Sequence, residues 1–166
     1  MSNIQKTVQV LIEAANRLDL RAPTKVTKDQ LGELLSYLKA LRECYQTMHW
    51  TSRGEHYYGD HQLFGRLYDE LVGEIDNLAE KAVGYTDDAY VVEVQYQTGR
   101  IATHVAEIMS HLPDMTSIQC LLFAENRLCK ELVPKAIAAL EQAGELSDGM
   151  ENFLQGVADK HEGNIY

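Results

Sequence analysis

The sequence is poor in residues that cross-link a chain or break its helices. It has three cysteines, three prolines and one tryptophan in 166 residues. Cys44, Cys120 and Cys129 are odd in number and form no Cys-x-x-Cys pair. We therefore expect free, mostly buried thiols in a reducing cytoplasm rather than a disulfide framework.

The sequence has no apolar run long enough to cross a bilayer. Its first ten residues, MSNIQKTVQV, lack the charged-then-apolar pattern of a secretory signal. A hydrophobic content of 45% is ample for a packed core. We expect one domain over residues 1–166, with residues 1–26 as an amphipathic N-terminal extension and a cytoplasmic location.

Basic residues are also few. Lys and Arg total 15 against 25 Asp and Glu, for a net charge of −10. Nucleic-acid binders gain affinity from clustered Lys and Arg, whereas here these residues are scattered and no lysine-rich tail is present. Direct DNA binding is therefore disfavoured, and an acidic surface suits the attraction of cations. The sequence also lacks a glycine-rich phosphate loop and a nucleophile motif.

What the sequence does contain is apolar residues at steps of three and four, which predict an all-α fold. Thr27 and Gln30 have the spacing of a capping box before the first long helix, and Thr116 and Gln119 have it again later. Pro134 should kink or open the helix that contains it. The predicted helices cover 3–18, 28–48, 60–84, 91–109, 117–143 and a last helix that follows Ser147.

A polar stripe runs beside the apolar stripe of the helix predicted over 60–84. It carries His61 at one end and Asp76 and Glu80 at the other. His61 and Asp76 are about 22 Å apart along a helix, so they cannot bind one metal within a chain. If the helix packs antiparallel against its own copy across a twofold axis, His61 faces Asp76, Tyr57 faces Glu80 and Gly65 faces Val72.

Each end of such a contact gathers one imidazole and two carboxylates. His49, just before a short polar turn, adds a second imidazole, and this ligand set suits ferrous iron or another divalent first-row metal. The alternative is that the histidines are interfacial polar residues and the carboxylates a solvated face. Trp50, in turn, suits an interface anchor.

These residues also resemble a known family. His49-Trp50, His61, Leu-Tyr-x-Glu-Leu over 67–71 and Asp76-x-x-Ala-Glu80-Lys are similar to the signature of Dps proteins, the small ferritins that protect bacterial DNA during starvation and oxidative stress. The resemblance is strongest over 48–83. It extends to 28–47 and 146–166, and it is poor over 85–115.

The resemblance implies a ferritin-like four-helix bundle, with an extra helix in its long crossover, that assembles into a dodecamer. It implies a ferroxidase centre between two subunits, with His49, His61, Asp76 and Glu80 as ligands and Trp50 close to the iron. One or two irons would bind, hydrogen peroxide would oxidise Fe(II), and ferric mineral would be stored inside the shell. It also implies acidic threefold pores, for which Glu145, Asp148 and Glu151 are the candidates.

The family usually has an aspartate where this chain has Gly65, so one carboxylate is missing from the expected centre. The glycine also suits close helix packing. Larger ferritins use Glu-x-x-His pairs inside one bundle, and no glutamate here precedes a histidine by three residues. A Dps-like structural or DNA-associated shell without efficient oxidation is the alternative function. We expect His56 to face solvent and His104 and His111 to be surface or core residues.

Overall fold

Helices fill most of residues 25–166, the part of the chain that this computed structural model describes, and no strand occurs among them. This confirms the all-α prediction. The helix predicted over 3–18 lies outside the described residues. The elements are α2 (Lys25–Thr51), α3 (Tyr57–Thr86), the short η1 (Ala89–Val92), α4 (Val94–Met109), α5 (Ser117–Arg127), η2 (Leu128–Leu132), α6 (Val133–Gln142) and α7 (Asp148–Glu162).

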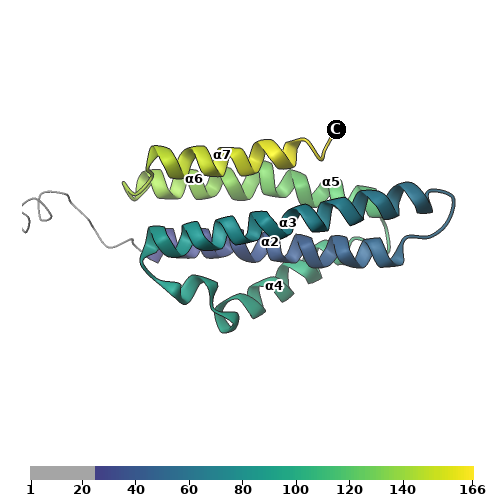
Figure 1. The fold of residues 1–166 in the computed structure, drawn as a ribbon, viewed down its shortest axis with the longest axis horizontal. Coiled ribbons are helices and arrows are strands. Elements are labelled where there is room, and N and C mark those ends of the chain that lie inside the picture. The colour runs from purple at the N-terminus through teal and green to yellow at the C-terminus, as the bar shows by residue number, and fades with distance from the viewer. Residues whose placement is uncertain (1–24) are drawn as a thin grey trace, which may run out of the picture.

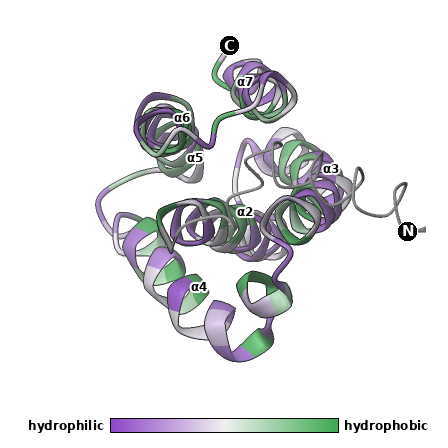
Figure 2. Ribbon diagram, turned by 90° about the vertical axis from the view of Figure 1, so that its left-hand side faces the viewer, coloured by the Kyte–Doolittle hydropathy of each residue, from purple (hydrophilic) through white to green (hydrophobic). Residues whose placement is uncertain are grey.

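Figure 1 shows α2 and α3 side by side and antiparallel, with the continuous rod α5–η2–α6 and the helix α7 packed along them. The α5–η2–α6 rod runs in the same direction as α3, so the chain must return along the bundle between them. Segments η1 and α4 make that return, and α4 packs against α2 on the side away from α6 and α7 (Figure 2).

The bundle has four long rods, which are α2, α3, α5–η2–α6 and α7. Their apolar stripes form one core. In α2 the stripe includes Leu31, Leu38 and Tyr45, which are fully buried. Figure 2 shows hydrophobic ribbon turned inward along the rods and hydrophilic ribbon turned outward. Cys44, Cys120 and Cys129 are free and buried in this core, and burial raises the pKa of Cys44 and of Cys129 to about 12. The prediction of free, buried thiols is confirmed, and the raised pKa values disfavour the reactive thiolate form.

The rod α5–η2–α6 opens locally where Pro134 requires it. Proline has no N–H to donate to the carbonyl four residues earlier. The five residues Leu128–Leu132 form a π-helix, and the N–H of Val133 donates to the carbonyl of Leu128. The predicted disturbance at Pro134 is confirmed. The rod then ends at Gly144, whose φ of +67° is in the left-handed region that favours glycine.

One predicted capping box is right and the other is wrong. At the start of α5, Thr116 Oγ1 accepts from the N–H of Gln119, and Gln119 Oε1 accepts from the N–H of Thr116. Thr27, in contrast, lies inside α2, which already begins at Lys25. Its buried hydroxyl donates to the carboxylate of Glu145 instead, because the tertiary contact replaces the local cap.

Polar contacts to α2 fix the crossover helix. The Nη1 atom of Arg100 lies 2.6 Å from Glu33 Oε2, and Nε2 of His104 lies 3.2 Å from Glu33 Oε1. The neighbouring His104 ring, together with Arg100, lowers the pKa of Glu33 to about 2 despite burial. His104 is therefore a buried residue of the core boundary, one of the two expected locations.

Tyr96 of α4 packs directly over Gly32 of α2. A Cβ on Gly32 would lie 2.6 Å from the Tyr96 ring, so the glycine permits the close approach of the two helices. No helix within residues 25–166 is both long enough and apolar enough to span a membrane.

Candidate functional site

His49 and His61 meet across the turn that joins α2 to α3. His49 lies in the last turn of α2, and His61 lies in the second turn of α3. Their rings stack with centroids 3.7 Å apart and planes inclined by 21°. The structure therefore brings the two predicted imidazoles together within one chain.

Each of these rings is held by the backbone of the other residue. His49 Nδ1 lies 2.7 Å from the carbonyl oxygen of His61, and His61 Nδ1 lies 2.9 Å from the carbonyl oxygen of His49. A carbonyl only accepts, so both Nδ1 atoms must carry the proton. In the neutral rings both Nε2 atoms then keep a lone pair. Metal-binding histidines typically have this arrangement, with one nitrogen donating to a carbonyl and the other on the metal.

Two tyrosines and one glycine enclose the pair. Tyr57 stacks on His61 with centroids 5.2 Å apart, and the edge of Tyr68 meets His49 at 5.4 Å. A Cβ on Gly65 would lie 3.2 Å from both Cε1 and Nδ1 of His49. Gly65 therefore makes room for the His49 ring within the same chain.

Asp76 and Glu80 lie further along α3 and do not reach the histidine pair within the chain, as their spacing requires. Both are exposed, and neither carboxylate makes a hydrogen bond or ion pair with the residues that the structure describes. On a helix they share one side of α3 with Tyr57, His61 and Val72.

That side of α3 also exposes apolar surface. Tyr57 is 44% exposed and Val72 is 51% exposed, while Trp50, next to His49, is 61% exposed. We define Tyr57, His61, Val72, Asp76 and Glu80 as the α3 face. It combines exposed rings and aliphatic groups with two carboxylates, a composition suited to an interface.

The candidate pore residues occupy the turn before α7 and its first coil. Asp148 is exposed and Glu151 is half-buried, and both lie in the first turn of α7. Glu151 accepts from the amide of Gln155 at 3.0 Å. Glu145 differs from them, because its carboxylate accepts from Thr27 and its backbone carbonyl accepts from Tyr85.

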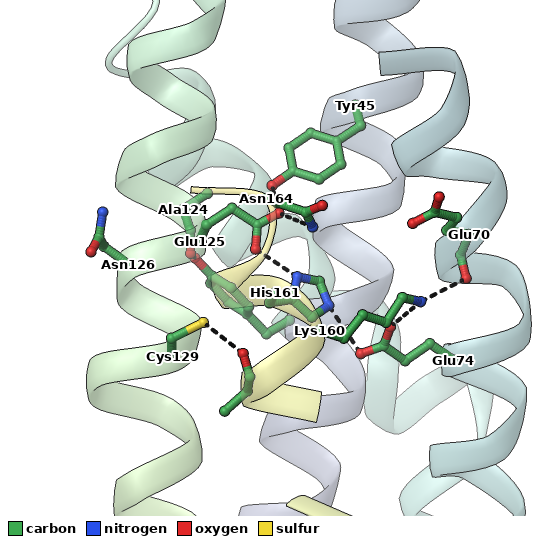
Figure 3. A network of polar contacts seen from close by, with 12 residues as sticks. Tyr45, Glu70, Glu74, Ala124, Glu125, Asn126, Cys129, Lys160, His161 and Asn164 are labelled. Carbon is green, nitrogen blue, oxygen red and sulfur yellow. Dashed lines mark hydrogen bonds and ion pairs between the residues drawn. The ribbon is translucent and has the colours of Figure 1, made fainter. Parts of the chain in front are cut away.

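A buried polar cluster inside the bundle was not predicted (Figure 3). His161 of α7 lies between two carboxylates, with Nδ1 2.5 Å from Glu125 Oε2 and Nε2 2.9 Å from Glu74 Oε1. Tyr45 donates to Glu125 at 2.7 Å, and Lys160 donates to Glu74 at 2.8 Å. Each of the four rods thus contributes to this cluster.

The carboxylates hold His161 as an imidazolium. Burial alone would lower the pKa of His161, but hydrogen bonds to Glu125 and Glu74 outweigh burial and raise it to about 9. Burial alone would raise the pKa of Glu74, but the bonds from His161 and Lys160 lower it. Burial, with the negative charge of Glu125, raises the pKa of Tyr45 well above its usual value.

A sequence signal for this cluster existed. Glu74 lies between Leu71 and Leu78 on the apolar stripe of α3, and all three are buried. Glu125 interrupts the stripe of α5 in the same way, and His161 that of α7. An ionisable residue at a core position of an amphipathic helix needs a buried partner, so three such residues predict one another.

His56 and His111 remain outside both clusters. His56 is exposed at the N-cap of α3 and makes no side-chain cap bond, as expected. His111 is half-buried against Phe123, with ring centroids 4.3 Å apart.

No protein-family model, no curated protein and no solved structure matches this chain.

Proposed function

We propose that the chain is the subunit of a ferritin-like, Dps-type shell that oxidises Fe(II) at a site shared between two subunits. The observation that carries the proposal is the pair of reciprocal bonds between His49 and His61. These bonds orient both rings and leave both Nε2 atoms as ligands before any metal arrives.

The remaining ligands come from a second copy of the chain. An antiparallel pairing of the α3 faces sets Asp76 and Glu80 of one subunit against His61 and Tyr57 of the other. Two nitrogens and carboxylate oxygens then surround one point, a set suited to Fe(II) as the substrate. Exposure of Tyr57 and Val72 supports a contact on this face.

The proposed reaction takes electrons from bound Fe(II) and gives them to hydrogen peroxide. Two Fe(II) ions reduce one peroxide molecule to the level of water, and the ferric product is stored as mineral inside the shell. The path of the chain supports the ferritin-like assignment, because α3 and the α5–η2–α6 rod run parallel and a long crossover joins them. The acidic net charge of −10 favours cation uptake over contact with DNA.

A second function is a Dps-like shell that serves as a scaffold or DNA-associated particle without efficient oxidation. Gly65 favours this alternative. It packs under the His49 ring and supplies no carboxylate. In residues 25–166 no three His, Cys, Asp or Glu side chains form a metal-binding group within one chain. Iron retained after expression would support the first function, and an empty, inert shell would support the second.

Subunit complementation tests the shared site. His61→Ala and Asp76→Asn proteins are each expected to form shells with little oxidation. Random mixing of the two gives heterodimers with one intact site, so about a quarter of the wild-type sites should return. Ferrous iron oxidation with peroxide is followed by absorbance. If unfolding and reassembly of the mixture restores no activity while wild-type protein recovers, the ligands do not come from two subunits.

A further inference from the structure

The crossover helix α4 is attached to the bundle through a largely polar set of buried residues. Its buried residues are Gln97, His104 and Ile108, so two of the three are polar. The four long rods bury mainly aliphatic and aromatic side chains. Figure 2 shows α4 against α2, on the side away from α6 and α7. The attachment of α4 therefore depends more on polar contacts than the packing of the rods does.

His104 is buried without the hydrogen bonds that a buried ring usually makes. It is 4% exposed, and neither Nδ1 nor Nε2 has a hydrogen-bond partner among the residues that the structure describes. Nε2 lies 3.2 Å from Glu33 Oε1, which is close enough for charge attraction but not aligned for a hydrogen bond. A buried polar group without a partner is destabilising, because it has lost its bonds to water. A neutral His104 ring therefore gains hydrogen bonds when α4 leaves α2.

A protonated His104 ring has the opposite preference. An imidazolium beside the Glu33 carboxylate gains a charge attraction that needs no aligned hydrogen bond. Glu33 is ionised at neutral pH, because His104 and Arg100 lower its pKa to about 2. The ring of Tyr37 packs roughly perpendicular to His104, with centroids 5.1 Å apart, and aromatic rings also favour a nearby cation. The charged ring loses both contacts when α4 leaves α2.

The charged and titratable groups around His104 come from α2, α4 and α5. They are Asp29, Glu33, Tyr37, Arg100, Glu107 and Arg127. Arg100 lies between two of the carboxylates, 2.6 Å from Glu33 and 3.9 Å from Asp29. Arg127 pairs with Glu107, which lies one turn after His104. Burial raises the pKa of Tyr37, so its phenol stays neutral. Three carboxylates against two guanidinium groups leave one negative charge, which favours a proton on His104.

We propose that His104 is a pH-dependent latch for the crossover helix. The protonated ring holds α4 on α2 through Glu33, and loss of the proton weakens that attachment. Ile101 of α4 and Val72 of the α3 face line one groove of about 470 Å³. The position of α4 therefore shapes the surface beside the α3 face. The latch does not depend on the proposed iron site.

Hydrogen exchange of the full chain, followed by mass spectrometry and corrected for the intrinsic exchange rate, tests the latch. Protection of α4 peptides should fall about tenfold from about pH 5.5 to about pH 8.5, because contacts of charged groups are stronger than neutral ones by roughly that factor. Peptides from α7 report opening of the whole bundle, which includes the effect of His161. The fall in α4 should exceed that in α7. His104→Gln should remove this excess, and His111→Gln, a control beyond the end of α4, should keep it.

Two results would overturn the proposal. One is an excess fall in α4 protection that His104→Gln leaves unchanged. The other is wild-type α4 protection that follows α7 at every pH. If His104→Gln does not fold, Glu33→Gln takes its place, because the Glu33 side chain is 28% exposed and tolerates a change of charge better. In that variant the excess fall should also be absent, and its persistence would equally refute the latch. Iron oxidation is not measured, so the proposed function and the latch fail separately.

Discussion

Gly65 of α3 lies against the ring of His49 of α2, and a Cβ at position 65 would come within 3.2 Å of two atoms of that ring. Contacts this short require the ring to move by a few tenths of an ångström. The ring is already fixed by its bond to the carbonyl of His61 and by its stack on His61. The residue at position 65 therefore controls the orientation of a proposed ligand.

The first prediction concerns Gly65→Asp. Restoring the family's carboxylate should not simply add a ligand, because the side chain displaces His49. We expect weaker metal binding at the histidine pair, with Gly65→Ala giving a smaller loss of the same sign. Co(II) titration measures the affinity, and sedimentation reports the assembly. Tighter binding in Gly65→Asp than in wild type would show that the missing carboxylate, and not the ring contact, limits the site.

The second prediction compares two nearby histidines. His61→Ala should abolish most iron oxidation and leave the assembly intact, because His61 is half-buried and its proposed role is that of a ligand. His56→Ala is the matched control, since His56 is exposed and caps nothing with its side chain. Peroxide-dependent Fe(II) oxidation is measured for both. Equal rates in the two variants, at matched assembly, would remove His61 from the site.

How far the sequence predicted this structure depended on whether a feature was local. The α-helices, the cap at Thr116 and the disturbance before Pro134 follow from short-range rules, and the structure confirms them. Thr27 shows the limit of those rules. Thr27 and Gln30 have the spacing of a capping box, but the Thr27 hydroxyl donates to Glu145, which is 118 residues away in the chain.

The same distinction between local and long-range features applies to the candidate site. The pairing of His49 with His61 could be anticipated because only a short turn separates their helices. The buried cluster could not be predicted from the polar stripe of α3, because Glu74, Glu125 and His161 come from three separate helices and lie on the apolar stripes that face the core. Asp76 and Glu80 stay predictions, since their proposed partners belong to another chain.

The third prediction is a stability profile set by the buried cluster. His161 has a pKa raised from 6.5 to about 9, so its contribution is complete below pH 6.5 and is lost as the pH rises through about 9. Glu74 has a lowered pKa, so its contribution is present above pH 4.5 and is lost as the pH falls through the lowered value. The free energy of unfolding should therefore decrease both as the pH rises above 6.5 and as it falls below 4.5.

The loss of unfolding free energy at alkaline pH should be on the order of 3 kcal/mol, because each pKa unit corresponds to about 1.36 kcal/mol. Chemical denaturation of wild type and of His161→Gln at a series of pH values measures it. The variant should be less stable at pH 6 and should lack the decline between pH 7 and 9. A decline of the same size in both proteins would assign it to other groups.

The fourth prediction concerns iron entry. Asp148 and Glu151 lie in the first turn of α7, where a threefold assembly would place three copies of each around an opening. Rings of carboxylates concentrate cations through a narrow passage. Changing them together to Asn and Gln should slow iron uptake and reduce its salt dependence, without changing metal affinity at the histidine pair. The competing explanation is that they only stabilise the helix N-terminus, by roughly 0.3–1 kcal/mol each.

Glu145→Gln supplies the comparison for this experiment. The Glu145 carboxylate accepts from Thr27 at the start of α2, so its loss should lower the melting temperature more than the rate of uptake. Uptake and thermal unfolding are measured on all the variants at two salt concentrations. If the Asp148 and Glu151 double variant keeps the wild-type rate and salt dependence and loses only thermal stability, then the carboxylates act on the helix end and iron enters elsewhere.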